Sequence, residues 1–206
     1  MRSWWHAAML AALVLAPAGA GAETFAHAGP GTAAPPAFGA FCRSHPGQCA
    51  RVGPLVERIA LTPARLAELR SVNASVNGAI REMGDLEHHG VEDHWSLAED
   101  GRGDCEDFAL LKRKMLIERG WPSSVLLMTT VSTPSGEGHA VLSVITDGGD
   151  LVLDNKTGAV LPWTGTGYAF YTRQSQRNPR AWVWIDHEPP AALAARAPRK
   201  RTTLAQ

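Results

Sequence analysis

The hydrophobic positions of the chain predict two helices, with strands after them. The first helix is expected over residues 62–83, where Thr62 can cap the helix and Pro63 suits its first turn. Its apolar positions, spaced three or four residues apart, are Leu66, Leu69, Val72, Val76 and Ile80. The second helix is expected over residues 105–118, and Gly120 is its stop signal.

After residue 122 the pattern changes to short runs rich in Val, Leu and Thr, which is typical of strands. The expected strands are residues 124–131, 138–146, 150–154 and 181–185. Asp147-Gly148-Gly149 is a hairpin signal between the second and third strands. Helices followed by antiparallel strands indicate an α+β domain, in which the helix over 105–118 packs against the sheet.

The start of the chain has the features of a secretory signal peptide over residues 1–22. Arg2 is followed by an uncharged apolar stretch, and Ala20-Gly21-Ala22 forms a small-x-small cleavage site. A retained membrane anchor is the alternative, but the apolar stretch is too short to span a bilayer. We therefore expect an exported, periplasmic protein that is not transmembrane after cleavage.

The chain has 206 residues in all, a length that suits one domain with a core of its own, or at most one and a half. Residues 23–40, rich in Ala, Gly and Pro, are expected to be a flexible lead-in. The domain is placed at residues 41–188, and residues 189–206, with a basic Arg-Lys-Arg run, are expected to be a disordered tail. With 20 basic and 20 acidic residues, the balanced charge argues against nucleic-acid binding.

Export changes how the three cysteines are interpreted. Cys42 and Cys49 lie close together and can form a disulfide in an oxidising compartment. Cys105 is then a free thiol, either inert and buried or reactive. Its neighbours Asp104, Glu106 and Asp107 are acidic rather than apolar, which favours the reactive interpretation.

Cys105, His139 and Asp154 follow one another in an order that suits a thiol nucleophile, its base and the group that orients the base. A helix N-terminus and a protonated His139 would both lower the pKa of the thiol. Asp104 and Glu106 lie about 100° to either side of Cys105 on the helix, so they need not face the sulfur.

The hairpin signal gives only an approximate distance between His139 and Asp154, the two expected partners of this thiol. A turn centred between Gly148 and Gly149 puts Asp154 opposite residue 143, on the strand face of His139 but about 13 Å away. A bend or an asymmetric turn has to close that gap. An ordinary strand histidine and a turn aspartate are the alternatives for these two residues.

A second polar group, in the irregular stretch before Cys105, resembles a loose metal cluster. It comprises His88, His89, Asp93 and His94, whose spacing fits no standard zinc pattern. A solvated polar loop is the favoured interpretation.

The motifs in order resemble those of the bacterial transglutaminase-like cysteine peptidase family, from about Phe41 to Ile185. They are Phe41-Cys42 with Cys49, Val72-Asn73, Val76-Asn77, Asp93-His94-Trp95, the run from Gly101 to Ala109 around Cys105, Gly138-His139-Ala140-Val141-Leu142, and Leu151 to Asn155. The resemblance implies a papain-like transglutaminase core with Cys105 as nucleophile, His139 as base and Asp154 as orienting acid.

The same resemblance implies a protein substrate and possible partners. Studied relatives are periplasmic, calcium-dependent proteases that release a surface adhesin and so loosen biofilm, under the control of an inner-membrane receptor. The acids at Asp104 and Glu106 correspond to residues that matter for calcium in those relatives, and carboxylate oxygens suit this ion. No cofactor is required for the thiol chemistry. This chain has a shorter segment between Trp95 and Cys105 than the family often has, so its substrate choice can differ.

Two other functions remain compatible with the sequence. Acyl transfer to an amine shares the acyl-enzyme and differs only in the attacking group. A non-catalytic binding module would keep the fold without turnover, although Cys105, His139 and Asp154 are all present.

Overall fold

A seven-stranded sheet organises the part of the chain described by this computed structural model, residues 24–185. The predicted signal peptide (1–22) and tail (189–206) lie outside the described residues. In spatial order the strands are β1 (Ala28–Thr32), β9 (Trp182–Ile185), β8 (Ala169–Gln174), β4 (Leu126–Ser132), β5 (Gly138–Thr146), β6 (Gly149–Leu153) and β7 (Leu161–Pro162). Every neighbouring pair in this sheet is antiparallel. The predicted α+β class is therefore confirmed.

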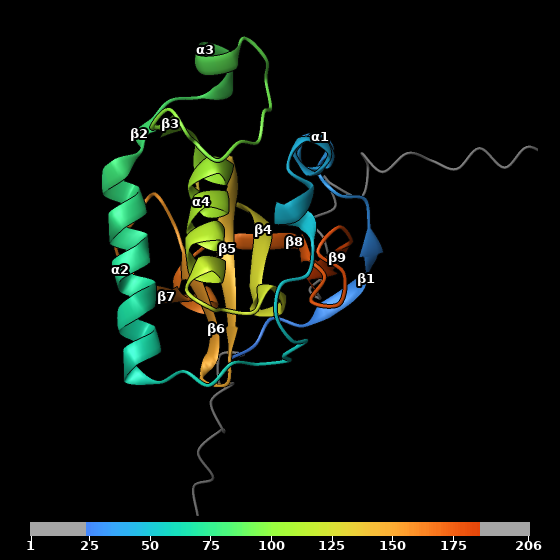
Figure 1. The fold of residues 1–206 in the computed structure, drawn as a ribbon, viewed down its shortest axis with the longest axis vertical. Coiled ribbons are helices and arrows are strands. Elements are labelled where there is room, and N and C mark those ends of the chain that lie inside the picture. The colour runs from blue at the N-terminus through green and yellow to red at the C-terminus, as the bar shows by residue number, and fades with distance from the viewer. Residues whose placement is uncertain (1–23, 186–206) are drawn as a thin grey trace, which may run out of the picture.

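Helices surround this sheet, together with short 3₁₀ turns and a small parallel strand pair. The helices are α1 (Pro36–Ser44), α2 (Pro63–Ala79), α3 (Asp85–His89) and α4 (Cys105–Glu118). The 3₁₀ turns are η1 (Pro46–Cys49), η2 (Ser123–Val125) and η3 (Trp163–Gly165), and the strand pair is β2 (Arg81–Glu82) with β3 (Arg102–Gly103). Figure 1 shows α2 and α4 side by side against the sheet, with α3 at the top beyond β2 and β3.

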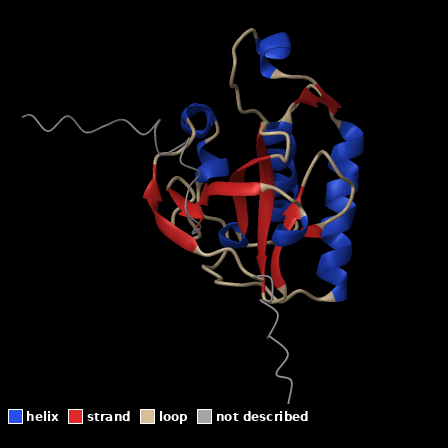
Figure 2. Cartoon of the chain, turned by 180° about the vertical axis from the view of Figure 1, so that it is seen from behind, coloured by secondary structure: helices blue, strands red, loops and turns tan. Residues whose placement is uncertain are grey.

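The larger hydrophobic core lies between the sheet and these two helices. Alternate residues of β5, among them Leu142 and Val144, join this core with Leu69 of α2 and Leu116 of α4. The opposite sheet face, turned to the viewer in Figure 2, carries a smaller apolar cluster that includes Val141. Strand alternation thus buries β5 on both faces and holds α4 firmly on the sheet.

Both predicted helices are present. The hydroxyl of Thr62 accepts a hydrogen bond from the Arg65 N–H at 3.2 Å, so α2 begins where its capping signal lies. It ends at Ala79 rather than at residue 83, because Arg81 and Met83 donate instead to Gly101 O and Gly103 O. The second helix has the predicted bounds, Cys105–Glu118.

The prediction of a flexible lead-in over residues 23–40 is wrong for most of that segment. Ala28–Thr32 forms β1 on the edge of the sheet beside β9, and α1 begins at Pro36. Strand pairing uses backbone groups, so an Ala- and Gly-rich segment can pair without a side-chain pattern. Proline in turn suits the first turn of a helix.

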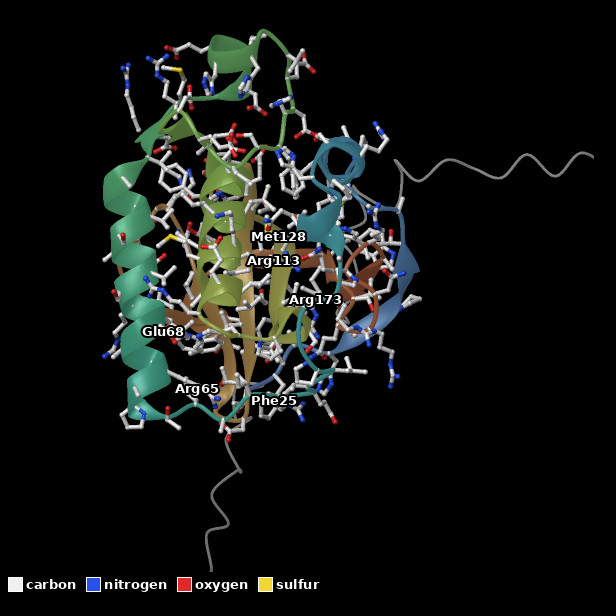
Figure 3. All side chains as sticks on the ribbon, viewed as in Figure 1. Phe25, Arg65, Glu68, Arg113, Met128 and Arg173 are labelled. Carbon is white, nitrogen blue, oxygen red and sulfur yellow. A yellow bond between two sulfur atoms is a disulfide. The ribbon has the colours of Figure 1, made fainter. Side chains whose placement is uncertain are left out.

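A local disulfide and a buried arginine hold α1 and α4 in place. Cys42 and Cys49 form a disulfide, as the sequence predicts. Arg113 of α4 is buried, and its guanidinium donates to Leu126 O at 3.0 Å and Gln48 O at 2.7 Å (Figure 3). Burial lowers the pKa of Arg113 to about 10, so its carbonyl partners still meet a cation at neutral pH.

Candidate active site

Cys105 is the first residue of α4, and it faces a cleft at the end of β5. The cleft has a volume of about 310 Å³, and its lining includes Trp95, Cys105, Glu106, His139 and Tyr171. The first N–H groups of a helix have no intrahelical acceptor, and the helix dipole at this end favours negative charge on the sulfur. The sequence prediction that the thiol stands at a helix N-terminus is confirmed.

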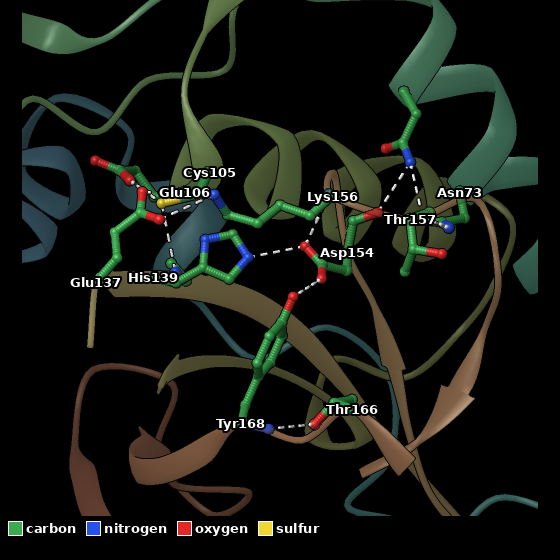
Figure 4. Close-up of polar contacts among 12 residues, drawn as sticks. Asn73, Cys105, Glu106, Glu137, His139, Asp154, Lys156, Thr157, Thr166 and Tyr168 are labelled. Carbon is green, nitrogen blue, oxygen red and sulfur yellow. Dashed lines mark hydrogen bonds and ion pairs between the residues drawn. The ribbon is translucent and has the colours of Figure 1, made fainter. Parts of the chain in front are cut away.

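The thiol sulfur has two polar contacts. The backbone N–H of Ala140, the residue after His139, donates to Cys105 Sγ at 3.4 Å. The thiol in turn donates to Oε2 of Glu106 at 3.0 Å. Figure 4 shows His139 between Cys105 and Asp154, so the structure brings all three predicted residues together.

The contact with Glu106 contradicts two expectations. This flanking carboxylate does face the sulfur, since its Oε2 accepts the hydrogen bond of the thiol. Burial, followed by the negative charge of Glu106, raises the pKa of the Cys105 thiol above its usual value. The lowering expected from the helix dipole is therefore outweighed in this arrangement.

His139 and Asp154 form a buried pair. Nε2 of His139 lies 2.8 Å from Oδ1 of Asp154, and both side chains are almost fully buried. The β5–β6 ladder pairs Thr146 with Gly149 and ends at Leu142 with Leu153. The centre of the turn thus lies one residue closer to β5 than the sequence analysis assumed. With this register, Asp154 follows Leu153 and lies diagonally opposite His139. This register closes the gap that sequence spacing left.

Two further groups donate to the Asp154 carboxylate. Tyr168 OH donates to Oδ2 at 2.6 Å, and the Lys156 N–H donates to Oδ1 at 3.1 Å. Burial opposes the charge of Asp154, but the hydrogen bonds from His139, Tyr168 and Lys156 outweigh it and lower the pKa of Asp154. Asp154 is therefore ionised at neutral pH. Tyr168 lies just before β8, a strand that the hydrophobic pattern did not reveal, so no local pattern pointed to this residue.

A cluster of carboxylates lies on the other side of the thiol. Asp85, Asp93, Asp104, Glu106 and Asp107 contribute to groups whose oxygens come within 4.8 Å of one another. Burial and then Asp104 raise the pKa of Glu106 to about 9, and burial raises the pKa of Asp107 to about 7. Crowded buried acids favour proton or cation uptake.

Oxygen atoms in this cluster are available to a cation. Oδ1 of Asp85 and Oδ1 of Asp104 are buried and have no hydrogen-bond partner among residues 24–185. Asp85, the first residue of α3, lies near each member of the predicted pair, with Asp104 in one group of acids and with Glu106 in another. Several hard oxygen donors fit calcium. Sequence reasoning missed Asp85 because it lies 19 residues before Asp104, outside any local motif.

The histidines near this cluster take no part in it. His88 Nε2 pairs with Asp100 Oδ2 at 2.8 Å, and the rings of His89 and His94 lie tilted against each other with centroids 4.3 Å apart. Within the described residues, the groups able to hold a metal contain carboxylates and Cys105 but no histidine. Asp93, which the sequence analysis grouped with these histidines, belongs instead to the carboxylate cluster.

Lys112 lies behind the site, two turns along α4 from Cys105. Its side chain is fully buried, and its Nζ lies 5.7 Å from the centroid of the Phe108 ring. Burial lowers the pKa of Lys112 to about 7, while the charge of Asp154 acts in the opposite sense. The Lys112 amine therefore lies within electrostatic reach of the orienting acid, on the helix side.

A helix-borne thiol and a strand-borne histidine that pairs with a buried aspartate define a thiol hydrolase of the papain and transglutaminase type. The family model described as bacterial transglutaminase-like cysteine proteinase (BTLCP) matches residues 28–189. The chain belongs to this family, and it is a cysteine peptidase whose substrates are proteins.

Solved structures give the same fold. The calcium-bound LapG of Legionella pneumophila is 24% identical, with a TM-score of 0.51 over 64% of this chain and 74% of that one. A second structure of Legionella pneumophila LapG is 25% identical, with a TM-score of 0.51 over 65% and 74%. No curated protein matches the chain by sequence. Among residues 24–185, no helix has the length and apolar character needed to cross a membrane.

Proposed function

We propose that Cys105, His139 and Asp154 form the catalytic triad of an exported cysteine peptidase. The observation that carries the proposal is the buried His139–Asp154 pair, 2.8 Å apart, beside the cleft that Cys105 lines. An ionised Asp154 fixes the histidine tautomer and stabilises its protonated form. These are the requirements of a base that serves a thiol nucleophile.

The reaction follows from these positions. His139 takes the thiol proton, and the Cys105 sulfur forms a bond with the carbonyl carbon of the substrate peptide. The protonated His139 then gives its proton to the leaving amine as the C–N bond breaks, leaving a thioester. Water, deprotonated by His139, hydrolyses the thioester and restores the thiol. Backbone N–H groups at the start of α4 contribute to stabilising the carbonyl oxygen.

Calcium is the ion that fits the carboxylate cluster. Asp85, Asp104 and Glu106 would hold it through carboxylate oxygens, which are its preferred ligands. When bound, the cation supplies positive charge where the acids now repel one another. The calcium-bound state of a similar protein supports the proposal.

The location and substrate follow from the family resemblance and from the start of the chain. The signal-like residues 1–22 support a periplasmic enzyme. The resemblance to adhesin-releasing proteases supports a surface adhesin as the substrate and an inner-membrane receptor as the regulator. Acyl transfer to an amine is a second candidate for the same thioester, which a primary amine would intercept in place of water.

The test is a comparison of surface proteins from the producing bacterium after incubation with wild-type enzyme or with Cys105→Ala, each with calcium. New protein N-termini that appear only with the wild-type enzyme are expected. A labelled primary amine added to the same reaction distinguishes acyl transfer, since it would be incorporated into the product. Identical products from both enzymes would contradict the proposal.

A further inference from the structure

Asp154 lies where β6 ends, and the loop that follows it is held from α2. Nδ2 of Asn77 donates to Asp154 O at 2.9 Å and to Thr157 O at 3.1 Å. Nδ2 of Asn73 also donates to Thr157 O, at 3.1 Å (Figure 4). Two asparagines one helical turn apart therefore bind both ends of the loop over residues 154–157.

These hydrogen bonds satisfy a backbone carbonyl that the sheet leaves unpaired. The β5–β6 ladder ends at Leu142 with Leu153, so the carbonyl of Asp154 lies beyond the last pair. Asp154 is only 3% exposed, and a buried carbonyl requires a donor. Asn77 provides that donor from a different element, 77 residues earlier in the chain.

The chemistry of these contacts requires amides. Each acceptor is a main-chain carbonyl, so the side chain must offer N–H groups, and Asn77 donates twice. Oδ1 of Asn73 and Oδ1 of Asn77 have no hydrogen-bond partner among residues 24–185. Both side chains act as donors to the loop, and neither uses its acceptor in a competing bond within the described chain.

The loop is thereby tied to the helical layer that holds the nucleophile. The Lys156 N–H bond to Asp154 Oδ1 closes the loop internally, which fixes its shape. The asparagines fix its place relative to α2, and α2 packs against α4, which begins at Cys105. The distance from the acid to the histidine and thiol thus depends on α2.

We infer that Asn73 and Asn77 are positioning residues that set Asp154 against His139. The inference rests on the proposed triad. It assigns a function to the asparagines of the motifs Val72-Asn73 and Val76-Asn77, whose role the sequence does not indicate. Asn77, which binds Asp154 itself, has the larger effect. Asn73 acts only through Thr157.

The test is a double-mutant cycle read by the rate at which iodoacetamide alkylates Cys105 at neutral pH with calcium. The four proteins are wild type, Asn77→Ala, Asp154→Ala and the double variant. Asn77→Ala is expected to slow alkylation about tenfold in the wild-type background, since a small misplacement of a catalytic group is costly. In the Asp154→Ala background it should have no further effect, because its target is already absent.

Controls separate positioning from loss of stability. Leu69→Ala removes a fully buried α2 side chain two turns before Asn77, so it should lower the melting temperature and leave the alkylation rate of the folded protein unchanged. Asn73→Ala should slow alkylation less than Asn77→Ala does. If Asn77→Ala does not fold, Asn77→Ser, whose single hydroxyl can serve at most one of the two carbonyls, takes its place in the cycle.

The outcomes are distinct. Equal slowing by Asn77→Ala in both backgrounds, or none in either, overturns the inference while leaving the triad intact. If wild-type Cys105 reacts no faster than Cys105 of His139→Ala, the triad itself fails and the inference fails with it.

Discussion

The thiol of Cys105 donates to the carboxylate of Glu106 at 3.0 Å, so the nucleophile faces an acid as well as the cleft it shares with His139. The pKa of Glu106 is raised to about 9, so this neighbour opposes thiolate formation once it ionises at alkaline pH. Because Glu106 also belongs to the carboxylate cluster, a cation held there would offset the charge beside the sulfur. The structure thus links the proposed calcium site to the proposed nucleophile through one side chain.

Above pH 9, where Glu106 ionises, Glu106→Gln is expected to make Cys105 more reactive without calcium. The amide cannot carry the negative charge that the ionised acid places beside the thiol, and lowering the thiol pKa by one unit corresponds to about tenfold more thiolate. The measurement is the iodoacetamide alkylation rate with calcium and with a chelator. Calcium should accelerate the wild type and leave Glu106→Gln nearly unaffected.

The matched control for that experiment is Glu118→Gln. Glu118 lies on the same helix and pairs with Lys114 at an exposed position, so this variant should keep the wild-type response to calcium. A strong calcium response in Glu106→Gln would show that the ion acts elsewhere.

Gly103→Ala is expected to destabilise the fold at the start of α4. A β-carbon at Gly103 would lie 2.7 Å from Cβ of Asp107, whose carboxylate accepts from the N–H groups of Asp104 and Ser96. Overpacking of this kind costs about 1–3 kcal/mol in the free energy of unfolding. Urea denaturation followed by circular dichroism measures it.

Gly78→Ala is the comparison for this substitution. A β-carbon at Gly78, inside α2, would meet nothing within 4 Å, so alanine should stabilise the helix by about 0.5–1 kcal/mol. A Gly103→Ala protein as stable as the wild type would contradict the close approach described here.

Lys112→Met is expected to raise the free energy of unfolding at pH 7, by about 1–4 kcal/mol. The pKa of Lys112 is about 7 in the folded chain and about 10.4 when unfolded. Between these values the unfolded chain binds a proton that the folded chain lacks, so wild-type stability rises with pH.

The advantage of Lys112→Met should therefore shrink as the pH rises from 7 towards 10. Urea denaturation of both proteins across this range measures the change. An advantage that stays constant, or a variant less stable than the wild type at pH 7, would contradict the burial of an unpaired ammonium group.

Replacing both Cys42 and Cys49 with serine should lower the free energy of unfolding by about 2–3 kcal/mol, because the disulfide restricts the unfolded chain. Thermal unfolding with and without dithiothreitol is the measurement. The reductant should lower the melting temperature of the wild type and leave the double variant unchanged. A wild type insensitive to complete reduction would show that the bond contributes little.

Local patterns in the sequence predicted α4 and β5 with the observed bounds, because capping, apolar spacing and stop residues lie within those segments. They did not predict β1 or β8. β1 pairs with β9, far along the chain, and its Ala- and Gly-rich residues show no alternation. Strand order is a long-range property that local spacing does not specify.

The residues of the site likewise divide into those that local sequence patterns predict and those that they do not. Cys105, His139 and Asp154 are apparent from their types and order, and the structure brings them together. Whether Asp154 reaches His139 depends on the hairpin register, and a one-residue difference in the turn decides it. Tyr168, Asp85 and the role of Asn77 depend on contacts between separate elements, so no local motif reveals them.

The central claim is that His139, oriented by Asp154, activates Cys105. Its most direct test is mass-spectrometric measurement of Cys105 alkylation by iodoacetamide, with calcium, in wild type, His139→Ala and urea-unfolded protein. The account predicts that folded wild-type Cys105 reacts fastest, by about tenfold or more, and that His139→Ala loses this advantage. Equal rates in wild type and His139→Ala would contradict the account.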